Sequence, residues 1–161
     1  MRFSYILLII GAAAVLLAYA FIYIVVRYYP FESTPLYKLT APKEYKTVQI
    51  GSAFFKLELA TTTLARAKGL GYRDSMGDDQ GMLFVFDTPG KYGFWMKGMR
   101  FPLDIIWLNK NKIVFMEENV PPPSSPIPPS YAPSRDADAV IELNAGMAKK
   151  LDVHIGDTIK F

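Results

Sequence analysis

Hydrophobic residues form an uninterrupted run near the start of the chain. Residues 5–26 read YILLIIGAAAVLLAYAFIYIVV and contain no charged side chain. At about 1.5 Å per helical residue, a helix of this length would reach roughly 33 Å and cross the hydrocarbon core of a bilayer. Four tyrosines lie in the second half of this run or just after it, as in an interfacial aromatic belt: Tyr19, Tyr23, Tyr28 and Tyr29. The pattern predicts one transmembrane helix within an N-terminal anchor of residues 1–27.

A cleaved signal peptide is the competing interpretation of this segment, because Ala18 and Ala20 flank Tyr19 in a small-x-small cleavage pattern. Cleavage there would leave the apolar stretch FIYIVV at the new N-terminus, so we expect the segment to be retained as an anchor. Residues 28–46 contain three prolines and no clean periodicity. They are predicted to form an extended tether.

Short apolar stretches follow the tether and predict strands. Phe55, Leu57 and Leu59 alternate with Lys56 and Glu58, which is the period of a half-buried strand. Further strands are expected, between Gly, Pro and other turn residues, at 82–86, 92–97, 103–108, 139–143 and 157–161. The stretch TTTLARAKGLG at 61–71 predicts a helix that a Thr caps and a Gly ends.

Turn residues complete the expected architecture. The tripeptide Asn109-Lys110-Asn111 separates two apolar strands and predicts a β-hairpin. Residues 47–161 are therefore expected to form one globular, mainly β domain, a compact sandwich or barrel with one or two short helices. Seven prolines lie within residues 121–139, which excludes a central strand there. This segment is either a flexible surface loop or a polyproline ligand for a partner.

Charge and composition exclude several kinds of site. Residues 47–161 hold thirteen basic and thirteen acidic residues, so the excess of three positive charges lies in residues 1–46. A globular part without a basic excess argues against nucleic-acid binding. The chain has no cysteine, which excludes disulfides, thiolate metal sites and cysteine nucleophiles. His154 is the single histidine, and no phosphate-binding or dinucleotide motif is present, so we expect neither a metal nor a cofactor.

The run YGFWMKGMRFPLD at 92–104 carries the strongest candidate chemistry. Asp104 belongs to a predicted strand with two apolar faces, and a buried carboxylate needs a partner. We expect an ion pair with Arg73, because a guanidinium can bind a carboxylate through two parallel hydrogen bonds. Such a pair has two possible roles. It is either a buried structural pair that fixes the strand register, or, together with Lys97, it faces a solvent-open cleft beside Trp95.

The cleft interpretation gives the predicted ligand-binding residues Arg73, Trp95, Lys97 and Asp104, which suit a sugar or another small polar molecule. An acid–base site is an alternative, in which Glu142 is the second carboxylate of a glycosidase-type pair with Asp104. The sequence gives no separation for these two carboxylates, and catalytic residues stay unassigned.

Five motifs stand in a recognisable order: GLGYR (69–73), GMLFVF (81–86), FWMKGMRFPLDIIWL (94–108), VIELNAG (140–146) and IGDTIKF (155–161). In order and spacing they resemble the domain of unknown function 192 family, over roughly residues 53–161. The resemblance implies a compact, jelly-roll-like β domain of bacterial and archaeal proteins, often behind a signal peptide or membrane anchor, and brings no established activity. This chain departs from the family at Gly71, where Met is usual, and in the Pro-rich segment, where many members carry cysteines.

The orientation of the predicted anchor depends on which signal is followed. Arg27, Lys38 and Lys43 outnumber Arg2, which by the positive-inside rule would leave the domain in the cytoplasm. The family resemblance favours instead an extracytoplasmic domain on a single-pass cell-membrane protein.

The predicted function is the binding of a small polar or glycan-like ligand, or of an envelope protein, by this membrane-anchored domain. One alternative is hydrolysis of envelope material with Asp104 and Glu142 as acid and base. The other is a structural interaction module that works through residues 121–139.

Overall fold

The computed structural model describes residues 15–21, 23, 43–125 and 127–161. Residues 15–21 and 23 are helical, and within the described residues no helix is both long and apolar enough to span a bilayer. Most of the predicted transmembrane helix (5–26) and of the predicted tether (28–46) lies outside the described residues. The described residues from 43 onwards belong to one compact unit.

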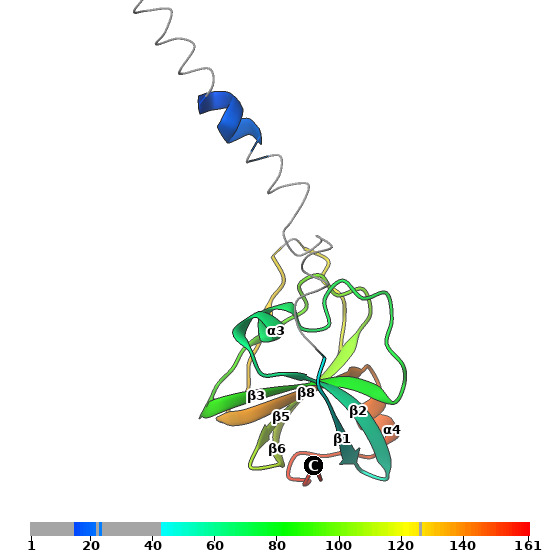
Figure 1. The fold of residues 1–161 in the computed structure, drawn as a ribbon. Helices are drawn as coiled ribbons and strands as arrows, with labels where there is room; N and C mark the ends of the chain where they lie inside the picture. Colours follow the sequence, from blue (N-terminus) through cyan, green and yellow to red (C-terminus); the bar gives the residue numbers. More distant parts are fainter. Residues whose placement is uncertain (1–14, 22, 24–42, 126) are drawn as a thin grey trace, which may run out of the picture. The chain divides into compact units, whose positions relative to one another are not determined.

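Six strands form the main sheet of this unit (Figure 1): β1 (Tyr45–Ile50), β2 (Ala53–Ala60), β3 (Gln80–Gly90), β5 (Leu103–Asn109), β6 (Lys112–Val120) and β8 (Ala137–Asn144). Their order is β1-β2-β3-β8-β5-β6, with β2 and β3 parallel and the other neighbours antiparallel. Two short strands, β4 (Phe94–Trp95) and β7 (Ser130–Tyr131), pair with each other. The helices of the unit are α3 (Thr63–Lys68) and α4 (Met147–Lys150).

The mainly β class is confirmed, whereas a barrel, one of the two expected architectures, is wrong. The sheet is open, and β1 and β6 are its two edges. Residues 157–161, expected to be a strand, make only isolated bridges, from Lys160 to Gln49 of β1 and from Thr158 to Lys112 of β6. The C-terminal residues thus lie beside both edge strands, and β1 and β6 do not pair with each other. The second sheet has only two short strands, so the described strands do not form a jelly roll either.

Side chains alternate along each strand, so the central strands bury both faces of the sheet. A first core on one face draws on both edge strands and the C-terminal residues, and its buried members are Val48, Ile50, Phe55, Leu57, Leu83, Ile106, Leu108, Ile113, Ile141, Leu143, Met147, Val153 and Ile159. A second core on the other face contains Ala60, Leu70, Met82, Phe84, Met96, Met99, Leu103, Ile105, Trp107, Val120, Ala137 and Val140. The two cores place consecutive residues of β8 in different surroundings.

Local sequence signals account for the ends of several elements. The Thr62 hydroxyl accepts a hydrogen bond from the Ala65 amide at 3.1 Å and caps α3, while Gly69 ends the helix with φ of 52°. Lys110 and Asn111 form the β5–β6 turn with φ of 50° and 66°, as the two-residue hairpin turns require. The predicted helix and hairpin are thus confirmed.

Candidate functional site

Asp104 does not pair with Arg73, which corrects the expectation from sequence. Its carboxylate is fully buried and accepts three backbone hydrogen bonds, from the amides of Asn119 at 2.8 Å, Gly146 at 3.1 Å and Ala148 at 2.8 Å. These donors come from the end of β6 and from the start of α4. Backbone amides therefore satisfy the buried oxygens of Asp104 in place of a guanidinium.

The register of the sheet explains this placement of Asp104. Asp104 lies opposite Leu143 on β8, so its side chain points towards the first core. Met147, the first residue of α4, belongs to the same core. The carboxylate joins three segments that are distant in sequence. Asp104 is a structural residue that fastens the C-terminal part of the chain to β5, and it does not line the cavity described below.

Arg73 has a different acidic partner, Glu58 of β2. Its Nη2 atom lies 2.9 Å from Oε2 of Glu58, and Nζ of Lys43 lies 3.1 Å from the same oxygen. Burial alone would raise the pKa of Glu58, but the hydrogen bonds and positive charges of Arg73 and Lys43 bring it below its usual value. Arg73 is therefore engaged in an ion pair, and it is not among the described residues that line the cavity.

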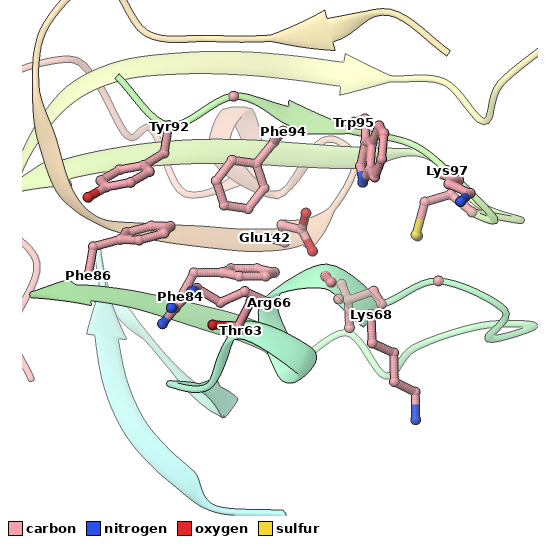
Figure 2. Close-up of a pocket in the computed structure, with 16 residues that line it drawn as sticks. Thr63, Arg66, Lys68, Phe84, Phe86, Tyr92, Phe94, Trp95, Lys97 and Glu142 are labelled. Carbon is pink, nitrogen blue, oxygen red and sulfur yellow. The ribbon is translucent and has the colours of Figure 1, made fainter. Parts of the chain in front are cut away.

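A cavity of about 320 Å³ opens on the second-core side of the sheet. Its walls come from α3 and the residues after it, from β3, from β4 and its flanks, and from β8. Figure 2 shows aromatic rings on two sides of it. The aromatic lining residues are Phe84, Phe86, Tyr92, Phe94 and Trp95, and the cationic ones are Arg66, Lys68 and Lys97.

Trp95 and Lys97, two of the four predicted ligand-binding residues, do line this cavity. Trp95 is 52% exposed, and Nζ of Lys97 lies 5.5 Å from the centre of its ring. Met96 is buried in the second core, and Phe94 packs edge-on against Phe84 at 4.7 Å between ring centres. Of the strand expected at 92–97, only Phe94–Trp95 forms one, while the expected alternation in exposure is present: Trp95 and Lys97 are exposed, and Phe94 and Met96 are more buried.

Glu142 supplies the carboxyl group of the cavity. Only 5% of the residue is exposed, and its Oε2 atom is buried without a hydrogen-bond partner in the described structure. In Figure 2 the carboxyl group lies between Phe94 and Trp95 on one side and Phe84 on the other. Burial raises the pKa of Glu142 to about 8, although the positive charge of Arg73 acts in the opposite direction. The group is therefore mostly a neutral acid at neutral pH.

Glu142 and Asp104 cannot act as one acid–base pair, because they lie on opposite faces of the sheet. Glu142 lies opposite Ile105, a residue of the second core, whereas the preceding residue of β5, Asp104, lies opposite Leu143. A one-residue offset reverses the direction of a strand side chain. Among the described residues that line the cavity, Glu142 has the only carboxyl group.

Sequence reasoning missed Arg66 and Lys68 as cavity residues. Nη1 of Arg66 donates to the carbonyl oxygens of Thr61 at 2.7 Å and Val85 at 3.2 Å, and the guanidinium lies 5.3 Å from the centre of the Phe86 ring. Neutral carbonyls fix the side chain without cancelling its charge. The spacing of Arg66 and Lys68 on a short helix gave no indication that this helix forms a cavity wall.

The Pro-rich segment reaches the same site. Ser130 and Tyr131 within it form β7, which pairs with Trp95 and Phe94 of β4. Gly93 permits this approach, because a Cβ atom there would lie 2.6 Å from the Ser130 hydroxyl. In the described part of the chain, no group of three or more His, Asp or Glu side chains is placed to hold a metal ion.

Comparisons with known proteins agree on a family but not on an activity. The profile of the DUF192 family, described as "Uncharacterized ACR, COG1430", matches residues 46–161. A crystal structure from Sinorhizobium meliloti 1021, of a protein whose name proposes a role as a transcription regulator, is 31% identical, with a TM-score of 0.67 over 74% of this chain and 95% of that one. A protein of unknown function from Novosphingobium aromaticivorans DSM 12444 is 28% identical, with a TM-score of 0.69 over 76% of this chain and 89% of that one. No curated protein matches the chain.

Proposed function

The chain belongs to the DUF192 family, and from that premise we propose that its β domain binds a small, polar, ring-bearing ligand of glycan-like kind in the cavity beside Trp95. The observation that carries this proposal is the carboxyl group of Glu142, which is buried at the cavity with one oxygen unpartnered. A buried polar atom without a partner costs about 1–3 kcal/mol, so a ligand that completes its hydrogen bonds gains affinity from it.

The walls of the cavity support a ring as the occupant. Trp95 offers a partly exposed indole for stacking, and Phe94 is held upright between Phe84 and Trp107, at 4.7 and 5.8 Å between ring centres. Pockets for small ligands commonly combine such apolar walls with a few convergent polar groups. A volume of about 320 Å³ corresponds to a ligand near the lower end of the usual range.

A fluorescence titration of the full-length chain in mild detergent tests the proposal. The probes are methyl glycosides of neutral hexoses, N-acetylhexosamines and hexuronic acids. We expect saturable quenching by at least one of them, because the ligand stacks on Trp95. In a parallel calorimetric titration, which does not depend on the Trp95 signal, Trp95→Ala should abolish binding, whereas Phe54→Ala, which removes a 65% exposed aromatic side chain outside the cavity, should not. Absence of saturable binding by every glycoside, or equal binding by the Trp95→Ala variant, would refute the proposal.

We also propose that the domain acts at the cell membrane, outside the cytoplasm. Support comes from the uncharged run at 5–26 and the family resemblance. Alkaline extraction of membranes should leave the full-length chain in the pellet, and external protease should cleave it in spheroplasts. Release by alkali, or protection of the domain from external protease, would contradict the respective half of this proposal.

Other functions receive less support from the site. Hydrolysis through Asp104 and Glu142 lacks its geometry, since these carboxyl groups lie on opposite faces of the sheet. Among the described residues of 121–139, the one large hydrophobic side chain that a partner module could present is Ile127, at 86% exposed, and the segment also pairs with the cavity wall. A role in transcription is not proposed, because residues 47–161 have no excess of basic side chains.

A further inference from the structure

The charges around the cavity are unequal in sign. Arg66, Lys68 and Lys97 line it, and Glu142 is the only acidic residue in the described lining. Arg66, whose described hydrogen-bond partners are neutral carbonyl oxygens, brings a positive charge to the lining, and burial keeps Glu142 neutral below a pKa of about 8. A cavity lined by charges of one sign concentrates ligands of the opposite sign. A cationic ligand would be repelled, and an anionic one attracted.

The hydrogen-bonding capacity of Glu142 leads to the same conclusion. A protonated carboxyl group has one O–H donor, and an anionic oxygen is the strongest acceptor for it. The unpartnered Oε2 atom is buried, so water competes poorly for this contact. Gly69 leaves room beside it, because a Cβ atom there would lie 4.0 Å from Oε2 of Glu142 and 3.6 Å from the Phe84 ring.

Other ionisable groups lie on this face of the sheet or line the cavity around Glu142. Glu58 lies two strands away across Met82, and Glu117 lies two strands away across Ile105. Arg73 lies close enough to act on Glu142 electrostatically, and it is held by Glu58. The remaining charged residues near Glu142 are Arg66, Lys68 and Lys97, which line the cavity.

We infer that the ligand is a ring-bearing carboxylate, a sugar acid of the uronic type, whose carboxylate accepts the Glu142 proton in a hydrogen bond while its ring stacks on Trp95. This inference rests on the proposed function and specifies its ligand class. The positive charge of Arg66 favours an anion, and the ionisation of Glu142 makes that preference depend on pH.

The experiment compares two probes that differ only at the sixth carbon, methyl β-glucuronide and methyl β-glucoside. The full-length chain in mild detergent is titrated with each, and tryptophan fluorescence reports binding. At about pH 6 the glucuronide should bind about tenfold or more tightly than the glucoside, because Glu142 is neutral. At about pH 9 that advantage should fall several-fold, because an ionised Glu142 repels the ligand carboxylate.

Three variants separate the contributions. Glu142→Gln keeps a donor but cannot ionise, so the advantage of the glucuronide should persist at the higher pH. Lys97→Gln should weaken glucuronide binding several-fold, whereas Lys150→Gln, which removes one exposed positive charge outside the described cavity lining, should not. Equal effects of the two lysine substitutions would overturn the inference.

The outcomes distinguish this inference from the proposed function. Saturable binding of the glucoside that equals or exceeds that of the glucuronide would overturn the carboxylate assignment and leave glycan binding intact. Tighter binding of choline, a cationic probe, would overturn it as well. Binding of no glycoside at either pH would refute both proposals together.

Discussion

Replacing Glu142 by Gln removes the ionisable proton from the cavity while keeping the length and shape of the side chain. The pKa of this carboxyl group rises from 4.5 in the unfolded chain to about 8 in the folded one. Between these values the folded state keeps a proton that the unfolded state releases. The free energy of unfolding therefore contains a contribution from Glu142 that is fully present below pH 4.5 and is lost as the pH rises towards 8.

The size of this effect follows from the same two values. Each pH unit within the window lowers the free energy of unfolding by about 1.4 kcal/mol, which amounts to roughly 3 kcal/mol by about pH 7. Gln has no such proton. The difference in stability between Glu142→Gln and the wild type should therefore grow in favour of the variant across the window, by roughly that amount.

Urea denaturation of the full-length chain at a series of pH values measures this difference. The buried Trp107 gives the fluorescence signal of unfolding, and it is present in both proteins. Subtracting the two curves cancels the other titrating groups, provided that Glu142 does not change their pKa values. Parallel curves for variant and wild type would refute the conclusion that Glu142 is a buried, neutral acid. A difference that grows towards low pH would refute it equally.

Three further substitutions test the surroundings of the site. Asp104→Asn should lower the free energy of unfolding by about 3 kcal/mol, because an amide group cannot accept all three backbone hydrogen bonds. Chemical denaturation measures this change, and an unchanged midpoint would contradict the prediction. Gly81→Ala should cost about 1–3 kcal/mol in the same assay, since its Cβ atom would lie 2.5 Å from the carbonyl oxygen of Glu142; a stabilised variant would show that the strands separate freely there. Arg73→Gln should raise the pKa of both Glu58 and Glu142, because the positive charge that lowers both pKa values is removed. An NMR titration of the carboxyl groups should show both midpoints at higher pH. If neither midpoint moved, Arg73 would not be the charge that acts on both groups.

Local patterns in the sequence were enough to predict much of the sheet. The alternation around Phe55 and Leu57 and the turn at Lys110 and Asn111 depend on neighbouring residues, and the structure contains both features. The sequence reasoning did not identify β1 (Tyr45–Ile50), because its first two residues were assigned to the tether. The edge position of the C-terminal residues also escaped prediction, since it depends on how distant strands are ordered.

The candidate site was predicted only in part for a similar reason. Trp95 and Lys97 follow from strand alternation, which is local. The partner of Asp104 could not be deduced from side chains, because its donors are backbone amides up to 44 residues away in the sequence. Which face of the sheet the Glu142 side chain lies on depends on the register of β8 with β5, and that register is fixed only when the strands pair. Its position between two apolar residues, Ile141 and Leu143, was nevertheless a usable signal of burial.

The pairing of β7 with β4 divides the Pro-rich segment into two shorter arms that meet at the rim of the cavity. Lengthening or shortening either arm would shift Trp95 while leaving the six-stranded sheet unchanged. If the proposed function holds for relatives, those that differ in this segment should accept differently shaped molecules. The same segment contributes Ala137 and Tyr131 to the second core, so it joins the rim of the cavity to the interior of the domain.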